Sequence, residues 1–150
     1  MHPLPGWHPI IVHFAIASSL TGGVALLLAR LMRGERAPRR CAVLGTFSLC
    51  IGAAGGLLAL VSGIAAVWEA DLTALQRAAV ALHVKWAFFT VMALLLVAVW
   101  RAAGAEPEEP PSNLFLAVAA GVMLAVAITG WLGGENVYRY GIGVMPPAGG

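Results

Sequence analysis

The sequence predicts an all-α fold, an integral membrane four-helix bundle with its N and C termini outside. Two observations support this prediction. Hydrophobic residues make up 60% of the chain and charged residues only 11%, whereas a soluble domain carries roughly 25% charged residues. A chain of 150 residues cannot bury so much apolar surface in one aqueous core, so lipid is the expected solvent.

The second observation is that four apolar runs are each long enough to cross a bilayer, which takes about 20 residues. A lipid-embedded helix also satisfies its own backbone hydrogen bonds. We therefore expect residues 1–150 to form a single transmembrane domain with helices at about 10–31, 41–67, 80–99 and 114–132.

The charges predict the orientation. The segment 30–40 holds five arginines against Glu35, and the positive-inside rule places such a loop in the cytoplasm. The termini and the loop 68–79 then face outward, where most of the tryptophans fall. The first residues lack a basic region before the apolar run, so a cleaved signal peptide is not expected. The predicted location is the bacterial inner (cytoplasmic) membrane, as a multi-pass protein.

Several functions are excluded. A net charge of +2, scattered along the chain, does not predict a nucleic-acid partner. Cys41 and Cys50 lie nine residues apart in one predicted helix, on opposite faces, so they cannot pair. No C-x-x-C-H motif is present, which excludes covalent c-type haem attachment. No nucleophile and base are arranged for hydrolysis.

The histidines are the most informative residues. His2, His8, His13 and His83 all fall on the predicted outer side, and the inner halves of the helices have none. His13 and His83 each lie about one turn inside a helix, at matched depth. Aligning them also aligns Gly34 with Gly104. This indicates either two similar hairpins related by a pseudo-twofold axis or a chance likeness between leucine-rich helices.

Polar side chains inside a membrane usually face the bundle interior, and three interpretations of His13 and His83 remain open. Each ring bonds a serine or a carbonyl of a neighbouring helix; or the two rings are the axial ligands of a haem b; or they join His8 and Glu135 in a transition-metal site. His8 precedes Pro9, which suits a first helical turn, so we expect His8 just outside the span, capping the helix or lining the outer mouth.

A haem would need cations for its propionates, and Lys85, Arg77 and Arg139 lie at about the right level. Each is equally explained as an interfacial residue that extends toward water. The pair Gly133-Gly134 predicts the end of the fourth helix. Beyond it, Glu135 and Tyr138 form either an interfacial segment or the border of a proton or quinol path.

The stretches HPIIVHFAIA, near the start, and TGWLGGENVYRYGIGV, near the end, together resemble the bacterial membrane family known as domain of unknown function 2231. The resemblance spans the whole chain, although Ala15 replaces a more usual proline. It implies a role in electron transport beside redox modules, similar in outline to haem b membrane anchors. The positions that match the family motifs are His8, Pro9, His13, His83, Gly130, Gly133, Gly134, Glu135, Tyr138 and Gly141.

The leading functional hypothesis is a cytochrome b-like electron-transport subunit, not a stand-alone enzyme. It holds one bis-histidine haem b through His13 and His83, with Lys85 and Arg139 near the cofactor, and moves electrons between a quinol pool and a periplasmic redox partner. Its other partners would be the lipid bilayer and further membrane subunits in a homo- or hetero-oligomer. The alternatives are a cofactor-free scaffold subunit and a transition-metal-binding protein.

Overall fold

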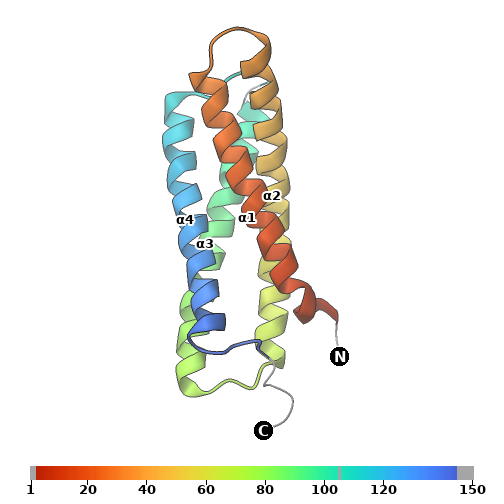
Figure 1. Cartoon of the computed structure of the whole chain (residues 1–150), viewed down its shortest axis with the longest axis vertical. Helices are drawn as coiled ribbons and strands as arrows, with labels where there is room; N and C mark the ends of the chain where they lie inside the picture. The colour runs from red at the N-terminus through yellow and green to blue at the C-terminus, as the bar shows by residue number, and fades with distance from the viewer. Residues whose placement is uncertain (1–2, 105, 145–150) are drawn as a thin grey trace.

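The structure, a computed structural model, describes residues 3–104 and 106–144 as four α-helices joined by short loops (Figure 1). The helices are α1 (Pro3–Leu31), α2 (Arg36–Glu69), α3 (Ala74–Gly104) and α4 (Asn113–Tyr138). All four are long and apolar enough to cross a membrane. The predicted all-α, four-helix class is confirmed.

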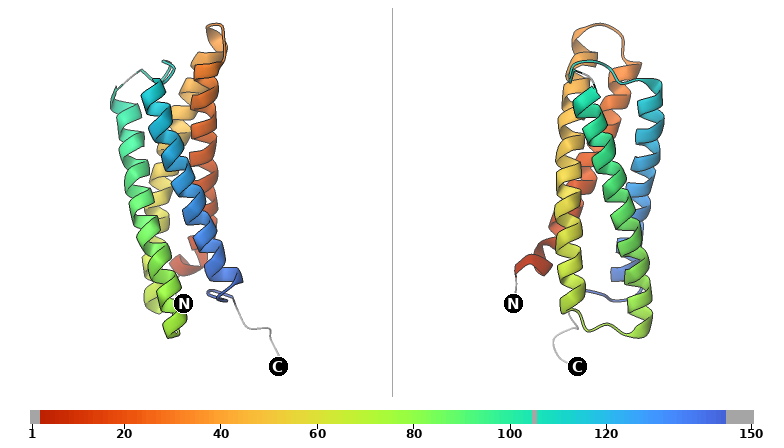
Figure 2. Two further views of the ribbon diagram at one scale, coloured as in Figure 1. Left: turned by 90° about the vertical axis from the view of Figure 1, so that its left-hand side faces the viewer. Right: turned by 180° about the vertical axis from the view of Figure 1, so that it is seen from behind.

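The helices run alternately up and down, so α1 begins and α4 ends at the same end of the bundle (Figures 1 and 2). We call this the histidine end, because His8 and His83 lie near it. The opposite end, which carries the α1–α2 and α3–α4 loops, is called the arginine end. This arrangement puts the start of α1 and the end of α4 on one side of the membrane.

Each helix is longer than the apolar run that predicted it. The apolar runs measure what the hydrocarbon core requires, whereas helices continue into the polar interface on both sides. The expectation that Gly133-Gly134 ends the fourth helix is wrong, because α4 continues to Tyr138. A glycine commonly ends a helix where the chain turns to a left-handed conformation, and the positive-φ glycines in this region are Gly141 and Gly143.

The start of α1 also differs from the prediction. His8 was expected outside the span, but the helix begins at Pro3 and contains both His8 and Pro9. Pro9 removes one backbone donor and bends the helix at this point, and the first turns of α1 are set at an angle to the rest (Figure 1). His8 therefore has a helical position and does not act as a cap.

The four helices form a ring in which each packs against two neighbours, leaving α1 diagonal to α3 and α2 diagonal to α4. The closest interface joins α1 and α2. A Cβ added to Gly22 would lie 2.7 Å from the backbone nitrogen of Leu49, and one added to Gly52 would lie 2.7 Å from that of Ser19. These glycines let the two backbones approach, as in other tightly packed membrane helices.

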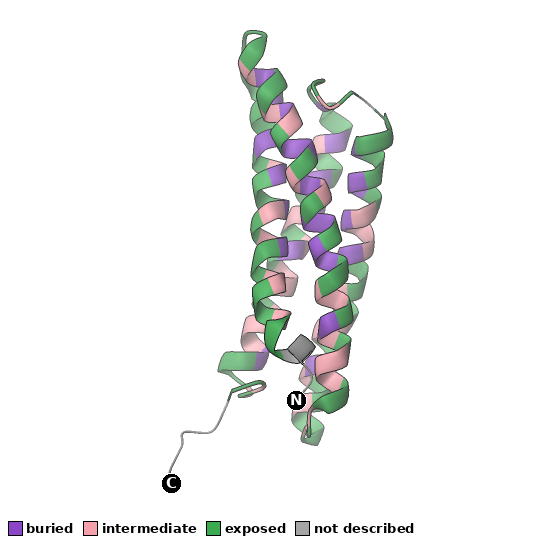
Figure 3. Cartoon of the chain, turned by 90° about the vertical axis from the view of Figure 1, so that its right-hand side faces the viewer, coloured by how far each residue is buried: buried purple, intermediate pink, exposed green. Residues whose placement is uncertain are grey.

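The apolar core lies toward the arginine end. Its fully covered members include Leu26 of α1, Leu49 of α2 and Leu94 of α3. At the histidine end, half-buried side chains are more common than buried ones (Figure 3). The helices therefore fill the bundle interior at one end and cover it only partly at the other.

A buried arginine lies at the arginine end of the bundle. Arg101, in the last turn of α3, is only 3% exposed. Its Nε donates to Thr46 Oγ1 of α2 at 3.0 Å, and its Nη2 donates to carbonyl oxygens of the α3–α4 loop, including that of Pro107 at 3.2 Å. The guanidinium thus joins α2, α3 and this loop through hydrogen bonds that a charged donor strengthens.

We expect Arg101→Met to lower the free energy of unfolding by about 2 kcal/mol, because loop carbonyls and the Thr46 hydroxyl lose a buried donor. The matched control is Arg33→Met, which removes an exposed arginine at the same end and should change stability by less than about 0.5 kcal/mol. Equilibrium unfolding in mixed detergent micelles, followed by circular dichroism, measures both. Equal effects of the two substitutions would contradict the role given to Arg101.

Candidate functional site

Two histidines lie near the same end of the bundle, on the diagonal helices α1 and α3. The first is His8, whose Nδ1 lies 3.0 Å from the hydroxyl of Ser62 on α2. Its ring also covers Gly63, where an added Cβ would lie 2.9 Å from Cε1 of His8. Only glycine leaves room for the imidazole at that position of α2.

Ser62 links His8 to α2. Its hydroxyl donates to the carbonyl of Ala59 at 3.1 Å and lies 3.0 Å from Nδ1 of His8. In the tautomer with the proton on Nδ1, His8 donates to Ser62 and its Nε2 presents a lone pair. A hydrogen bond to one ring nitrogen is also how proteins orient a histidine whose other nitrogen binds a metal.

The second histidine, His83 on α3, lies against α4. Its ring covers Gly133, where an added Cβ would lie 3.2 Å from Cε1, and it lies beside the carbonyl group of Thr129. Its Nδ1 is the buried side-chain polar atom without a hydrogen-bond partner in the described part of the chain. Buried polar atoms are normally paired, so an unpaired nitrogen calls for an explanation such as an absent ligand.

The two rings lie toward the same end of the bundle, on helices that do not pack against each other. They also have equivalent surroundings: a histidine of the first helix in each hairpin rests on a glycine of the second. The repeat expected from the sequence aligned His13 with His83 and Gly63 with Gly130, so these contacts do not follow that alignment. The residue of α1 that corresponds to His83 in these contacts is His8, not His13.

The structure does not bring His13 to His83. The His13 side chain is exposed, and its Nδ1 bonds the carbonyl of Pro9 in the same helix at 2.6 Å. Five residues rotate a helix by about 140°, so when His8 faces α2, His13 points away from it. The expectation that His13 and His83 converge is therefore wrong, because equal depth does not fix the face of a helix.

The alternative metal site is not assembled either. In residues 3–104 and 106–144, no three or more histidine, cysteine, aspartate or glutamate side chains are placed to hold a metal ion. Glu135 instead forms an ion pair with Arg139 at 3.2 Å. His2 lies outside the described residues. The set His8, His13, His83 and Glu135 is thus reduced to two neighbouring imidazoles.

The remaining predicted residues lie on the surface of the histidine end. Arg139 lies over the ring of Tyr140, 5.6 Å from its centroid, Lys85 is exposed, and Arg77 donates to the carbonyl of Leu72 at 3.1 Å. A shallow hollow opens on this surface of α4. Its lining residues are Trp131, Gly134, Glu135, Tyr138 and Arg139.

The sequence analysis missed the residues that support the two rings. Ser62 holds His8, while Gly63 and Gly133 make room for the imidazoles. Thr129, beside His83, also bonds Thr90 of α3 through their hydroxyls at 2.8 Å. The available signal was that Ser62-Gly63 and Thr129-Gly130 interrupt apolar helices near the level of the histidines. That signal does not say which histidine each pair contacts.

Fold and site together define a four-helix membrane protein with two semi-buried histidines facing neighbouring helices near one end of the bundle. Residues 2–146 match the family model described as "Predicted membrane protein (DUF2231)", and the chain therefore belongs to this family. No curated protein and no solved structure matches the chain.

Proposed function

We propose that the protein is a haem b-binding membrane subunit that moves electrons between a quinol pool and a redox partner at the histidine end. In this proposal the axial ligands are His8 and His83, and His8 replaces the His13 expected from the sequence. One observation carries the proposal: two imidazoles on the diagonal helices α1 and α3, each resting on a glycine of a neighbouring helix, lie toward the same end of the bundle.

The number of histidines favours haem over a bare metal ion. A structural zinc site takes four protein ligands and a catalytic one takes three, and the described residues assemble no such group. Haem b needs only axial ligands from the protein, because the porphyrin supplies the other nitrogens. Haem supplies one-electron transfer at its iron, and the protein supplies orientation and access.

The hydrogen bonding of the two imidazoles also supports haem ligation. In the tautomer that donates from Nδ1 to Ser62, Nε2 of His8 has a free lone pair, which is the form that binds iron. His83 keeps a buried nitrogen without a protein partner. Side chains at this end are more often half-buried than buried (Figure 3), in contrast with the apolar core at the other end.

The hollow on α4 supports a quinol as the electron donor. It combines the exposed rings of Trp131 and Tyr138 with the Glu135–Arg139 ion pair. Gly134 lines this hollow, and the preceding Gly133 contacts His83, so only the backbone of α4 separates the two features there. A lipid-borne quinol headgroup would reach the hollow from the bilayer, and the Glu135 carboxylate would accept a proton from it.

We propose further that the histidine end faces the periplasm of the bacterial inner membrane. The arginines of the α1–α2 loop favour the cytoplasm, and this leaves the histidine end outside. A redox partner would then dock on the periplasmic side, as a separate protein or as another subunit.

Purification of the full chain from a host supplied with haem precursor tests the proposal. The expected result is a reduced-minus-oxidised spectrum with the α-band of a low-spin b-type haem and a pyridine haemochrome of haem b, near one haem per chain. Colourless protein without iron would overturn the haem assignment. Iron without a haemochrome would point instead to a bare metal site.

One contact favours a second candidate, a cofactor-free scaffold subunit. The His8–Ser62 bond already satisfies one nitrogen of an intramembrane imidazole through a neighbouring helix, which is a structural use of histidine. A scaffold would give colourless protein from the haem-supplemented host and would still co-purify with its partner subunits.

A further inference from the structure

We infer that the α1–α2 loop at the arginine end is a binding surface for anionic phospholipid headgroups, formed by Arg33, Arg36 and Arg40. This inference is independent of the haem proposal, since it concerns the opposite end of the bundle and does not depend on which side of the membrane that end faces.

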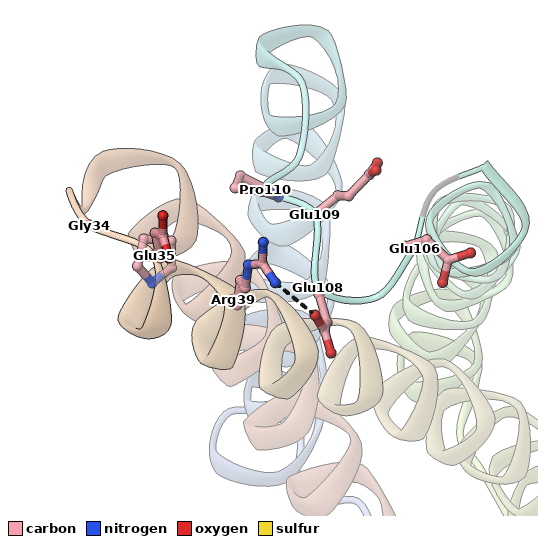
Figure 4. A pocket seen from close by; sticks show the side chains of 8 residues that line it. Gly34, Glu35, Arg39, Glu106, Glu108, Glu109 and Pro110 are labelled. Carbon is pink, nitrogen blue, oxygen red and sulfur yellow. Dashed lines mark ion pairs between the residues drawn. The ribbon is translucent and has the colours of Figure 1, made fainter.

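The arginines of this region divide into two groups. Arg30 and Arg39 are already engaged: Arg30 Nε donates to Asn113 Oδ1 at 3.1 Å, and Arg39 forms an ion pair with Glu108 at 3.5 Å (Figure 4). Arg33, Arg36 and Arg40 are exposed and form no ion pair or side-chain hydrogen bond within the described chain. We call these three residues the free arginine group.

The free arginine group experiences electrostatic repulsion when no external anion is bound to the protein. Arg36 and Arg40 are four residues apart on α2 and therefore share a face, where like charges repel. Both also lie near the positive end of the helix dipole, and the first turn of α2 has neither an acidic residue nor a side-chain cap. An external anion would relieve all of these repulsions together.

The nearby acidic residues lie around a hollow. Glu106, Glu108 and Glu109 belong to the α3–α4 loop, and the hollow that they line with Arg39 lies between that loop and the start of α2 (Figure 4). Glu35, the N-cap residue of α2, lines the same hollow. Within the described chain, the ion pair at this end joins Glu108 to Arg39, so none of these carboxylates neutralises the free arginine group through an ion pair.

The depth of the free arginine group points to lipid. Leu31 and Leu44, which flank it along the chain, are 67% and 54% exposed, as expected of side chains in contact with acyl chains. Arginines at the edge of such an apolar surface lie at the level of the headgroups, where each basic residue gains about 1 kcal/mol from an anionic leaflet. Phosphate also suits the forked guanidinium donor.

The test uses the full-length protein in a mild non-ionic detergent, titrated with phosphatidylglycerol or phosphatidylcholine, with bound lipids counted by native mass spectrometry. The wild type should prefer phosphatidylglycerol, and this preference should weaken as salt is raised. Arg36→Gln/Arg40→Gln should reduce it by roughly tenfold or more. The matched control, Arg30→Gln/Arg39→Gln, makes the same change in net charge on engaged arginines and should largely keep it.

Three results would overturn the inference. The wild type could bind the two lipids equally, which would indicate that the surface binds an acidic protein segment and not anionic lipid. Arg36→Gln/Arg40→Gln could keep the full preference for phosphatidylglycerol. Both double variants could lose it equally, which would make the effect one of net charge alone. Because Arg36 and Arg40 are exposed and have no ion-pair or side-chain hydrogen-bond partner within the described residues, their replacement should not lower the thermal stability of lipid-free protein.

Discussion

Replacement of His83 by alanine should abolish haem binding, with at least a tenfold loss of haem per purified chain and loss of the reduced α-band. His83→Ala removes one of the two imidazoles that we propose as axial ligands, and the remaining histidine cannot supply the bis-histidine coordination of the proposed low-spin haem b. His8→Ala should have the same effect. The measurement is the pyridine haemochrome assay on protein that elutes as a single species in gel filtration.

His13→Ala is the discriminating control. His13 is exposed and bonds its own helix, so this variant should keep haem and its α-band. Loss of haem in His13→Ala, together with retention in His8→Ala, would restore the ligand pair that matched depth in the sequence predicted and would refute the pair that the structure favours.

The second large effect should come from the α1–α2 interface. Gly52→Leu would place side-chain atoms against the backbone of Ser19, where even a Cβ would lie 2.7 Å from the backbone nitrogen. Backbone cannot move aside as a flexible side chain does, so the two helices must separate. We expect a loss of about 3 kcal/mol in the free energy of unfolding, at the upper end of typical overpacking costs.

Gly121→Leu on α4 is the matched control, because a Cβ at Gly121 would meet nothing within 4 Å. It introduces the same side chain into a helix of the same bundle but should cost less than about 1 kcal/mol. Both variants are compared by equilibrium unfolding in mixed micelles. Similar stability of Gly52→Leu and Gly121→Leu would show that the α1–α2 packing contributes little.

The fold class could be predicted because it depends on quantities that add up along the chain. The length of an apolar run decides whether that segment can cross the bilayer. The spans around Leu26 and Leu94 can therefore be predicted without knowing which helices pack against them. The exact ends could not be predicted in this way. Glycine at 133 and 134 resembles a helix end in sequence, but neither glycine adopts a positive φ, and α4 continues through both to Tyr138.

The candidate site was predicted only in part. The sequence pointed to the histidine end and to His83, which the proposed site retains, because a histidine in an apolar helix is conspicuous wherever it faces. On the first helix it pointed to His13, which the proposed site replaces with His8. His8 and His13 differ in depth by less than two turns, and the choice between them depends on rotation about the helix axis, which only the packing against Ser62 and Gly63 reveals.

By itself, the sequence determined that this chain forms four membrane-spanning helices with its histidines gathered at one end and most of its arginines at the other. Each segment's preference for lipid or water depends on its own hydrophobic and charged residues. These contributions can be added along the sequence without coordinates. The tertiary structure alone decided which imidazoles approach each other and which arginines remain free. These outcomes depend on the azimuthal angle at which each helix meets its neighbours, and that angle is set by contacts between residues far apart in the chain.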